Sequence, residues 1–324
     1  MGMEQRRSGR QKCSKGGEKL IRISQLKLPI THTKAQLEKK IAKTLKNPGN
    51  SFTYEIKKQS LDCRHKNDKI FVYTVDVTIR DEQKLAKKVN NNNIMLTKEK
   101  PYEFPSPGET PLLHSPVIVG SGPAGLFCGW YLAKAGYCPI ILERGEEAEK
   151  RQKTVKNFWK NGVLDPESNV QFGEGGAGAF SDGKLNTLVK DPYGRNHEVL
   201  KRFVAAGAPE EIIYQQKPHL GTDVLVGIVE KMRHEIEEMG GKFCFRSKVT
   251  DLIFENNTLK EIEINNDKRI PAQVCVLAPG HSARDTFEML QKRGVYMEPK
   301  SFAVGLRIEP VSYTHLRAHE TEAD

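Results

Sequence analysis

Apolar and polar positions alternate over the first hundred residues in a pattern that predicts a small mixed domain. Residues 20–28 (LIRISQLKL), 52–63 and 69–80 alternate apolar with polar side chains, which is typical of strands with one buried face. A helix is predicted to begin at Thr33, whose hydroxyl can cap the first turn, and its apolar side chains recur every four residues. Residues 81–89 can form a second, short helix. The pattern therefore predicts an α+β domain with an antiparallel sheet, which we expect to be ferredoxin-like.

Composition then divides the chain into segments. Residues 1–19 are basic and contain no apolar run, so we expect a disordered tail. The α+β domain covers residues 20–90. A run of asparagines followed by four prolines indicates an extended linker over residues 91–112. The main domain begins at residue 113 and extends to residue 310.

The pattern changes at the start of the main domain. A short apolar run, Val117 to Val119, is suited to a buried parallel strand. A helix and a second strand, residues 138–142, follow it, and Glu143 ends that strand. The turn between the first strand and the helix contains Gly120, Gly122, Pro123, Ala124 and Gly125. This order of elements predicts a Rossmann-type βαβ unit that binds an adenine dinucleotide: a strand, a glycine turn, a helix, a second strand and then an acidic residue.

The residue types in this turn suit dinucleotide binding for physical reasons. Gly120 permits the tight turn out of the strand, Gly122 lets the backbone approach a pyrophosphate, and Gly125 lets the helix pack on the strand. Pro123 lies in the first helical turn, where its missing N–H is harmless. The helix N-terminus offers free N–H groups to phosphates. Glu143 lies 18 residues after Gly125 and can accept ribose hydroxyls. Its charge would repel a 2′-phosphate, which argues against NADP at this site.

A second glycine-rich stretch occupies residues 169–184 (NVQFGEGGAGAFSDGK). An acidic, proline-containing segment precedes it in place of an apolar strand, so we do not interpret it as a second Rossmann turn. Its glycines can lie against a flat ring or a phosphate. The candidate cofactor-facing residues here are Gly173, Gly175, Gly176 and Gly178. The long excursion after Glu143, without a third Rossmann strand, favours FAD over NAD.

The sequence resembles an uncharacterised family of bacterial FAD-dependent dehydrogenases among the glutathione-reductase-like flavoproteins. The likeness rests on GSGPAGLF and ERG, on SNVQFGEGGAGAFSDGKLNT and on LAPGHSARD, and it covers roughly residues 20–309. It implies FAD, an α/β fold with a three-layer parallel sheet, and hydride transfer through flavin N5. It also implies cofactor contacts from Arg144, the backbone of Val249 and the turn at Gly280, where Pro279 departs from the family's usual residue. It names no substrate.

The catalytic residues stay open at this point. The candidates are His219, His281 and Lys184, each near a segment expected to face the flavin. His315 and His319 resemble a metal pair, but no third ligand is evident, so we expect no metal site. The tail at 311–324 (VSYTHLRAHETEAD) matches nothing in the family, and we interpret the chain as a C-terminally truncated fragment whose activity is in doubt.

Charge and composition leave alternatives open. The 324-residue chain has a formal net charge of +10, no apolar run long enough to cross a bilayer and no CxxC pair among six cysteines. We therefore expect a cytoplasmic oxidoreductase that acts on a small molecule, with NAD(P)H as one candidate electron donor. The charge suggests a flavin-dependent RNA-modifying enzyme as an alternative, although no basic stripe interleaved with aromatics supports nucleic-acid binding. A non-catalytic flavin-binding or electron-carrier protein is the other alternative.

Overall fold

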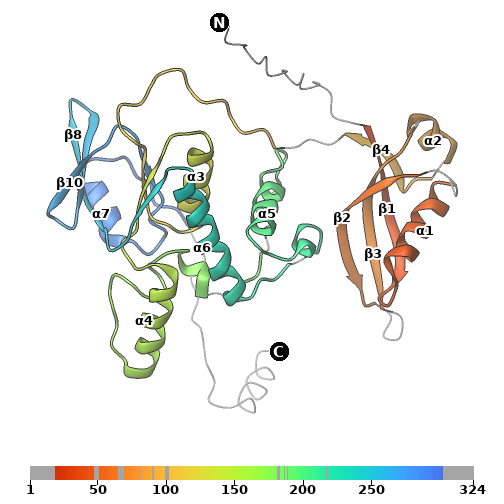
Figure 1. Ribbon diagram of the computed structural model, residues 1–324, viewed down its shortest axis with the longest axis horizontal. Coiled ribbons are helices and arrows are strands. Elements are labelled where there is room, and N and C mark those ends of the chain that lie inside the picture. The colour runs from red at the N-terminus through yellow and green to blue at the C-terminus, as the bar shows by residue number, and fades with distance from the viewer. Residues whose placement is uncertain are drawn as a thin grey trace, which may run out of the picture. The chain divides into compact units, whose positions relative to one another are not determined.

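The computed structural model describes residues 19–46, 51–64, 69–80, 82–89, 91–98, 102–180, 183–185, 187, 189–216 and 218–301 (Figure 1). The chain divides into two compact units, Met1–Ala283 and Arg284–Asp324. The described part of the second unit contains helix α7 (Arg284–Lys292). The tail expected before residue 19 and the one expected over 311–324 lie outside the described residues.

The N-terminal elements form the expected ferredoxin-like domain. They are β1 (Lys19–Pro29), α1 (Lys34–Thr44), β2 (Thr53–Asp62), β3 (Ile70–Thr78), α2 (Glu82–Val89) and β4 (Ile94–Lys98). The strand order is β2-β3-β1-β4, and all three strand pairs are antiparallel. Both helices pack on one face of the sheet, because Leu37 and Ile41 of α1 and Leu85 of α2 join one core cluster with Ile23 and Val75.

Helix α1 begins where the sequence predicts. The Thr33 hydroxyl accepts a hydrogen bond from the Gln36 N–H, and the Gln36 side chain accepts one from the Thr33 N–H, which completes a capping box. Leu37 and Ile41 are then buried, as the four-residue spacing requires. The local sequence therefore fixes both the start of this helix and the face it buries.

Strand β4 corrects the linker prediction. The linker was expected to begin at residue 91, but Ile94–Lys98 pair with β1, and Ile94 packs against the domain core. The described asparagines, residues 91–93, form a turn in which the Asn93 N–H donates to the Asn91 side-chain oxygen at 2.9 Å. A polar run thus precedes a short strand whose pairing depends on β1, a partner more than 60 residues away in the sequence.

The main domain contains a parallel sheet and an antiparallel meander. The sheet strands are β5 (Val117–Val119), β6 (Ile140–Leu142), β7 (Lys242–Cys244) and β11 (Cys275–Leu277), in the order β11-β5-β6-β7. The helices are α3 (Pro123–Lys134), α4 (Ala148–Asn161), α5 (Arg195–Ala205) and α6 (Thr222–Glu238), with short 3-10 turns η1 (Ala177–Phe180) and η2 (Glu210–Ile213). The meander comprises β8 (Val249–Glu255), β9 (Thr258–Ile264) and β10 (Lys268–Pro271).

All neighbouring strands of this four-stranded sheet are parallel, which confirms the α/β fold class. Helices α3 and α6 pack against the sheet residues Ile118 and Ile141 in one core cluster. From β5 the chain passes to β6 and β7 on one side, and it returns to β11 on the other. Such a reversal of strand order is where open α/β sheets bind ligands, beyond the carboxyl ends of the strands. No helix among the described residues is long and apolar enough to cross a membrane.

Candidate functional site

The turn after β5 is held by two very close backbone approaches. Gly120 has φ +99°, and a Cβ placed there would lie 2.4 Å from the carbonyl oxygen of Ala278, which follows β11. A Cβ on Gly125 would lie 1.9 Å from the Gly120 carbonyl oxygen. Real Cβ atoms do not approach that closely, so both positions require glycine. The turn therefore lies at the reversal point between β5 and β11.

The N-terminus of α3 opens from this turn without a side-chain cap. Gly122 is the N-cap residue in extended conformation, and Pro123 occupies the first helical turn. A Cβ on Gly122 would meet only the Gly176 Cα, at 3.8 Å, which is ordinary van der Waals contact. Unlike Gly120 and Gly125, Gly122 is thus not demanded by protein packing. Its lack of a side chain leaves space beside the helix N–H groups, where an anion is stabilised.

Glu143 is buried, and its carboxylate holds the glycine turn. One oxygen accepts hydrogen bonds from the Ser121 N–H at 2.9 Å and the Ser121 hydroxyl at 2.7 Å, and the other accepts from the Gly145 N–H at 2.9 Å. A carboxylate has about four acceptor positions, so three are used by the protein. The predicted grip on both ribose hydroxyls therefore needs the Ser121 hydroxyl to rotate away. The sequence analysis did not single out Ser121, since it fills a variable position of the glycine motif.

The second glycine-rich stretch packs directly on the first. The Gly175 N–H donates to the Ser121 carbonyl at 3.0 Å, and a Cβ on Gly176 would lie 3.1 Å from the Gly122 Cα. Gly173, Gly175 and Gly176 all have positive φ, and the chain then enters the 3-10 turn η1. The stretch is a loop laid against the Rossmann turn rather than a Rossmann turn of its own, as expected.

A buried arginine holds this loop. Arg151 of α4 is 1% exposed, and its guanidinium donates to the carbonyl oxygens of Asn169, Val170, Gly173, Glu174 and Gly176 at 2.7–3.2 Å. Burial lowers the pKa of Arg151 to about 10, against the favourable charges of Glu143 and Glu174, so the side chain stays charged at neutral pH. Arg151 was not among the residues predicted from the sequence. The sequence does contain a signal for it, because Arg151 is a charged residue at a helical spacing that places it on the same buried side of α4 as Ala148 and Val155.

Two further ion pairs attach the loop to the surrounding elements. Glu174 is fully buried and accepts from the Ala148 N–H and from the Arg233 side chain, both at 2.7 Å. Burial raises the pKa of Glu174 above the ordinary value. Arg144, a predicted cofactor residue, donates to Glu167 at 2.7 Å, and its guanidinium lies 4.1 Å from the centre of the Phe172 ring. Its interactions shown here are with the loop, and its role toward a cofactor stays a prediction.

The segment after β7 passes beside Glu143. The Glu143 N–H donates to the Cys244 carbonyl at 2.9 Å, and the Ser247 N–H donates to the Glu143 carbonyl at 2.8 Å. Val249, two residues later, is buried at the start of β8. At the other side of β5, the Ala278 N–H donates to the Val119 carbonyl, and Gly280 follows with φ +77°. The predicted contact segments thus flank the turn, although Val249 and Gly280 themselves remain untested as cofactor contacts.

The structure brings two of the three catalytic candidates together. Lys184 and His219 form an isolated antiparallel bridge, and beside it a Cβ on Gly183 would lie 1.5 Å from the Leu220 carbonyl oxygen. His281 is exposed and contacts the hydroxyl of Ser282 at 3.3 Å. No group of three potential metal-ligating side chains occurs in the described part of the chain, and His315 and His319 lie outside it. The catalytic assignments therefore stay predictions.

An ion-pair network at the base of the loop should make its stability depend on pH. Arg246 contacts Glu146 at 2.8 Å and Asp165 at 2.7 Å. The hydrogen bond from Arg246 lowers the pKa of Asp165. At Glu146 burial acts to raise the pKa, but the hydrogen bonds from Thr154 and Arg246 outweigh it, so the pKa of Glu146 is lowered as well. A lowered folded-state pKa gives stability that is present above the unfolded-state value and is lost as the pH falls through the folded-state value.

We therefore expect Arg246→Met to lower the free energy of unfolding at pH 7 by about 0.2–1 kcal/mol per ion pair, as is typical of pairs in contact with solvent. The deficit should begin to shrink as the pH falls below the ordinary carboxyl pKa values of 3.8 and 4.5. It should vanish once the pH is below the lowered pKa values of the folded state. Urea unfolding at a series of pH values measures this. Lys242→Met, at an exposed position of β7, is the control. An Arg246→Met deficit that did not change with pH would contradict the assignment.

Comparison with known proteins gives partial matches. Residues 118–149 match a family described as an NAD(P)-binding Rossmann-like domain, and residues 20–78 match a domain of unknown function (DUF8436). An uncharacterised protein of Clostridium beijerinckii is 44% identical over 290 residues, which cover 89% of this chain and 54% of that protein. The chain thus spans about half the length of the curated relative it matches.

Solved structures resemble the chain over about half its length. They include THI4 of Thermovibrio ammonificans (22% identity, TM-score 0.37, covering 56% of this chain and 63% of that one). They also include thioredoxin reductase of Lactococcus lactis (16% identity, TM-score 0.29, covering 51% and 35%). These likenesses are too distant to bear on function, so the functional argument rests on the residues of the site.

Proposed function

We propose that the chain is the dinucleotide-binding part of an FAD-dependent oxidoreductase. The observation that carries the proposal is the contrast within the glycine turn. Gly120 and Gly125 are required by backbone contacts, whereas a Cβ on Gly122, at an uncapped helix N-terminus, would make only an ordinary contact with the Gly176 Cα. A glycine that packing does not require, next to free N–H groups, is what a bound pyrophosphate needs. The match of residues 118–149 to a Rossmann-like family supports the same interpretation.

The course of the chain after Glu143 favours FAD over NAD. The chain continues from β6 into α4 and then into the second glycine-rich loop, which returns to pack on the first turn. A cofactor that extends past the pyrophosphate would meet this loop. FAD is such a cofactor, and its flavin would supply hydride transfer through N5. NAD(P)H is the electron donor that we propose for such a reaction.

Within this proposal each part of the chain has a task. The N-terminus of α3 binds the pyrophosphate, and Glu143 accepts a ribose hydroxyl while it also holds the turn through Ser121. The backbone of Gly173, Gly175, Gly176 and Gly178 lies along the cofactor, and the buried Arg151 keeps that loop in place. Lys184 and His219, which share a bridge, are proposed to face the substrate, as is His281. The substrate is a small molecule whose identity the site does not specify.

Gly122→Ala provides the test because it separates binding from folding. The added methyl group has room in the protein, so we expect unchanged thermal stability. In the complex it would press on the pyrophosphate; an inserted methyl costs about 1–3 kcal/mol, which is about 5- to 150-fold in affinity. The measurement is titration of the refolded full chain with FAD, followed by the change in flavin fluorescence.

Gly227→Ala is the matched control. Gly227 lies on α6, and a Cβ there would meet nothing within 4 Å. Its FAD affinity should equal that of wild type. Equal FAD affinity of Gly122→Ala and wild type would contradict binding of the pyrophosphate at this turn. Failure of wild type to bind FAD at any concentration tested would contradict FAD as the cofactor.

A further inference from the structure

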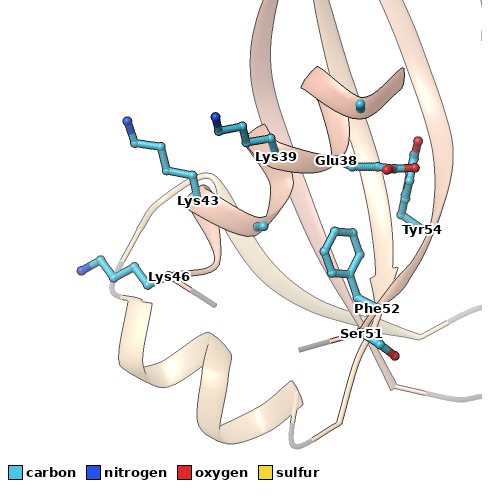
Figure 2. A pocket seen from close by; sticks show the side chains of 9 residues that line it. Glu38, Lys39, Lys43, Lys46, Ser51, Phe52 and Tyr54 are labelled. Atoms are coloured by element: carbon cyan, nitrogen blue, oxygen red, sulfur yellow. The ribbon is translucent and has the colours of Figure 1, made fainter. Parts of the chain in front are cut away.

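A groove on the N-terminal domain lies between α1 and the start of β2 and encloses about 900 Å³ (Figure 2). One wall is the side of α1 that carries Lys39 and Lys43, with Lys46 just after the helix. The other wall is formed by Phe52 and Tyr54. All of these residues belong to one domain, and none of them takes part in the dinucleotide site.

The lysine wall is a row of positive charges. Lys39, Lys43 and Lys46 are exposed, and Figure 2 shows Lys39 and Lys43 extending from one side of α1 and Lys46 extending the same way from just past its end. Within the described residues none of the three forms an ion pair. Lys39 and Lys43 are one helical turn apart, and like charges at that spacing repel each other. A polyanion would relieve this repulsion along the whole row, whereas one phosphate group could contact only part of it.

The aromatic wall supplies flat apolar surface beside the charges. Phe52 and Tyr54 are half-buried, so part of each ring borders the groove. Ala42, a small residue on the facing side of α1, leaves space in front of them. Burial, and then the charge of Glu38, raises the pKa of Tyr54 above its ordinary value. Aromatic rings beside lysines are the combination that binds single-stranded nucleic acids through base stacking and phosphate contacts.

We propose that this groove binds single-stranded nucleic acid, with phosphates along Lys39, Lys43 and Lys46 and a base stacked on Phe52. This groove was not predictable from the sequence, because its basic and aromatic residues are not interleaved along the chain. They meet only when α1 packs beside β2. An acidic peptide would use the charges but not the ring faces, and duplex RNA keeps its bases stacked inside the helix. Single strands are the polyanion that uses both walls.

The first experiment measures binding of a fluorescein-labelled 12-nucleotide oligo(U) to the full chain by anisotropy across salt concentrations. Three phosphate contacts at about 0.7 per phosphate give a slope of about −2 in log affinity against log salt. Raising the salt from 50 to 200 mM should then weaken binding about twentyfold. Polyglutamate and duplex RNA of the same length serve as competitors, and both should compete weakly.

Charge variants locate the site. Lys39→Gln/Lys43→Gln/Lys46→Gln should weaken binding at least about tenfold and reduce the salt slope by about 2. The matched control replaces Lys153, Lys156 and Lys160, which are also exposed and lie at nearly the same spacing on α4. It removes the same charge from the main domain, so it should leave both the affinity and the slope nearly unchanged.

Phe52→Leu tests stacking separately. Leucine keeps apolar bulk where Phe52 packs against the domain core, but it removes the ring face. We expect about fivefold weaker binding or more, with an unchanged salt slope, because one stacked base is lost and no phosphate contact is. Circular dichroism and thermal unfolding of each variant establish that the domain remains folded.

Any of the following results would overturn the proposal. The first is no oligo(U) binding by wild type at 50 mM salt. The second is equal weakening by the α1 and α4 triple variants, which would show attraction to overall charge alone. The third is wild-type affinity in Phe52→Leu, or polyglutamate that competes as well as unlabelled oligo(U); either would indicate an acidic ligand without stacked bases.

Discussion

Gly125→Ala is expected to destabilise the main domain by more than about 3 kcal/mol, the upper part of the usual cost of overpacking. A Cβ at this position would overlap the Gly120 carbonyl oxygen at 1.9 Å. That oxygen belongs to the backbone of the turn, so no side-chain rotation relieves the clash. Helix α3 would have to move away from β5, which opens the core formed by Ile118 and Trp130. Urea unfolding followed by tryptophan fluorescence measures the loss directly.

The comparison with the other two alanine variants makes this result specific. Gly122→Ala adds the same methyl group three residues earlier in the same turn, where the structure leaves room, and Gly227→Ala adds it on α6. Both should unfold at urea concentrations close to that of wild type. Equal stability of Gly125→Ala and Gly122→Ala would mean that the close approach of helix and strand is absent in solution.

The Rossmann unit was predictable from the sequence because its signals are local. The apolar strand, the glycine turn, Pro123 and the acid at Glu143 lie within 27 residues, and each matches a specific backbone requirement of the motif. Helix α1 was predictable for the same reason, since its cap at Thr33 and its apolar face are both short-range patterns. The α/β class of the main domain follows from these local units.

Features that depend on distant partners were not predictable. Strand β4 is only five residues long, and it is a strand because β1 offers an edge for pairing. Arg151 reads as a surface charge on a polar helix until the loop from Asn169 to Gly176 surrounds it with carbonyl oxygens. Ser121 occupies a position that the glycine motif leaves open, and its bond to Glu143 emerges only when both strands end at the same edge.

These missed residues change the physical interpretation of the site. The sequence analysis assigns Glu143 to the ribose alone, but the structure gives most of its acceptor capacity to Ser121 and Gly145. The carboxylate therefore shapes the turn through contacts within the protein. The same principle applies to the second glycine-rich stretch, to whose carbonyl oxygens the side chain of Arg151 donates. The candidate site is thus built largely from contacts within the chain itself.

Arg151→Met should be the most damaging change outside the glycine turn. Methionine fills much of the volume but donates no hydrogen bonds, so five carbonyl oxygens, of which those of Gly173 and Glu174 are buried, lose their shared donor. A buried carbonyl oxygen that is left without a donor costs about 1–3 kcal/mol. Gly173, Gly175 and Gly176 have no Cβ, so the freed loop has many alternative conformations and should become mobile before the domain unfolds.

Limited proteolysis and urea unfolding together measure both effects. We expect new cleavage sites between residues 165 and 180 in Arg151→Met, and weaker FAD binding because the loop no longer stays beside Gly122. Arg151→Lys keeps the charge, but its ammonium has three donors on a flexible stem and cannot match the fork of a guanidinium, so most of the loss should remain. Lys153→Met, an exposed position on the same helix, should behave as wild type. If Arg151→Met resisted protease as well as Lys153→Met did, the loop would have to be held by Glu174 and Arg233 instead.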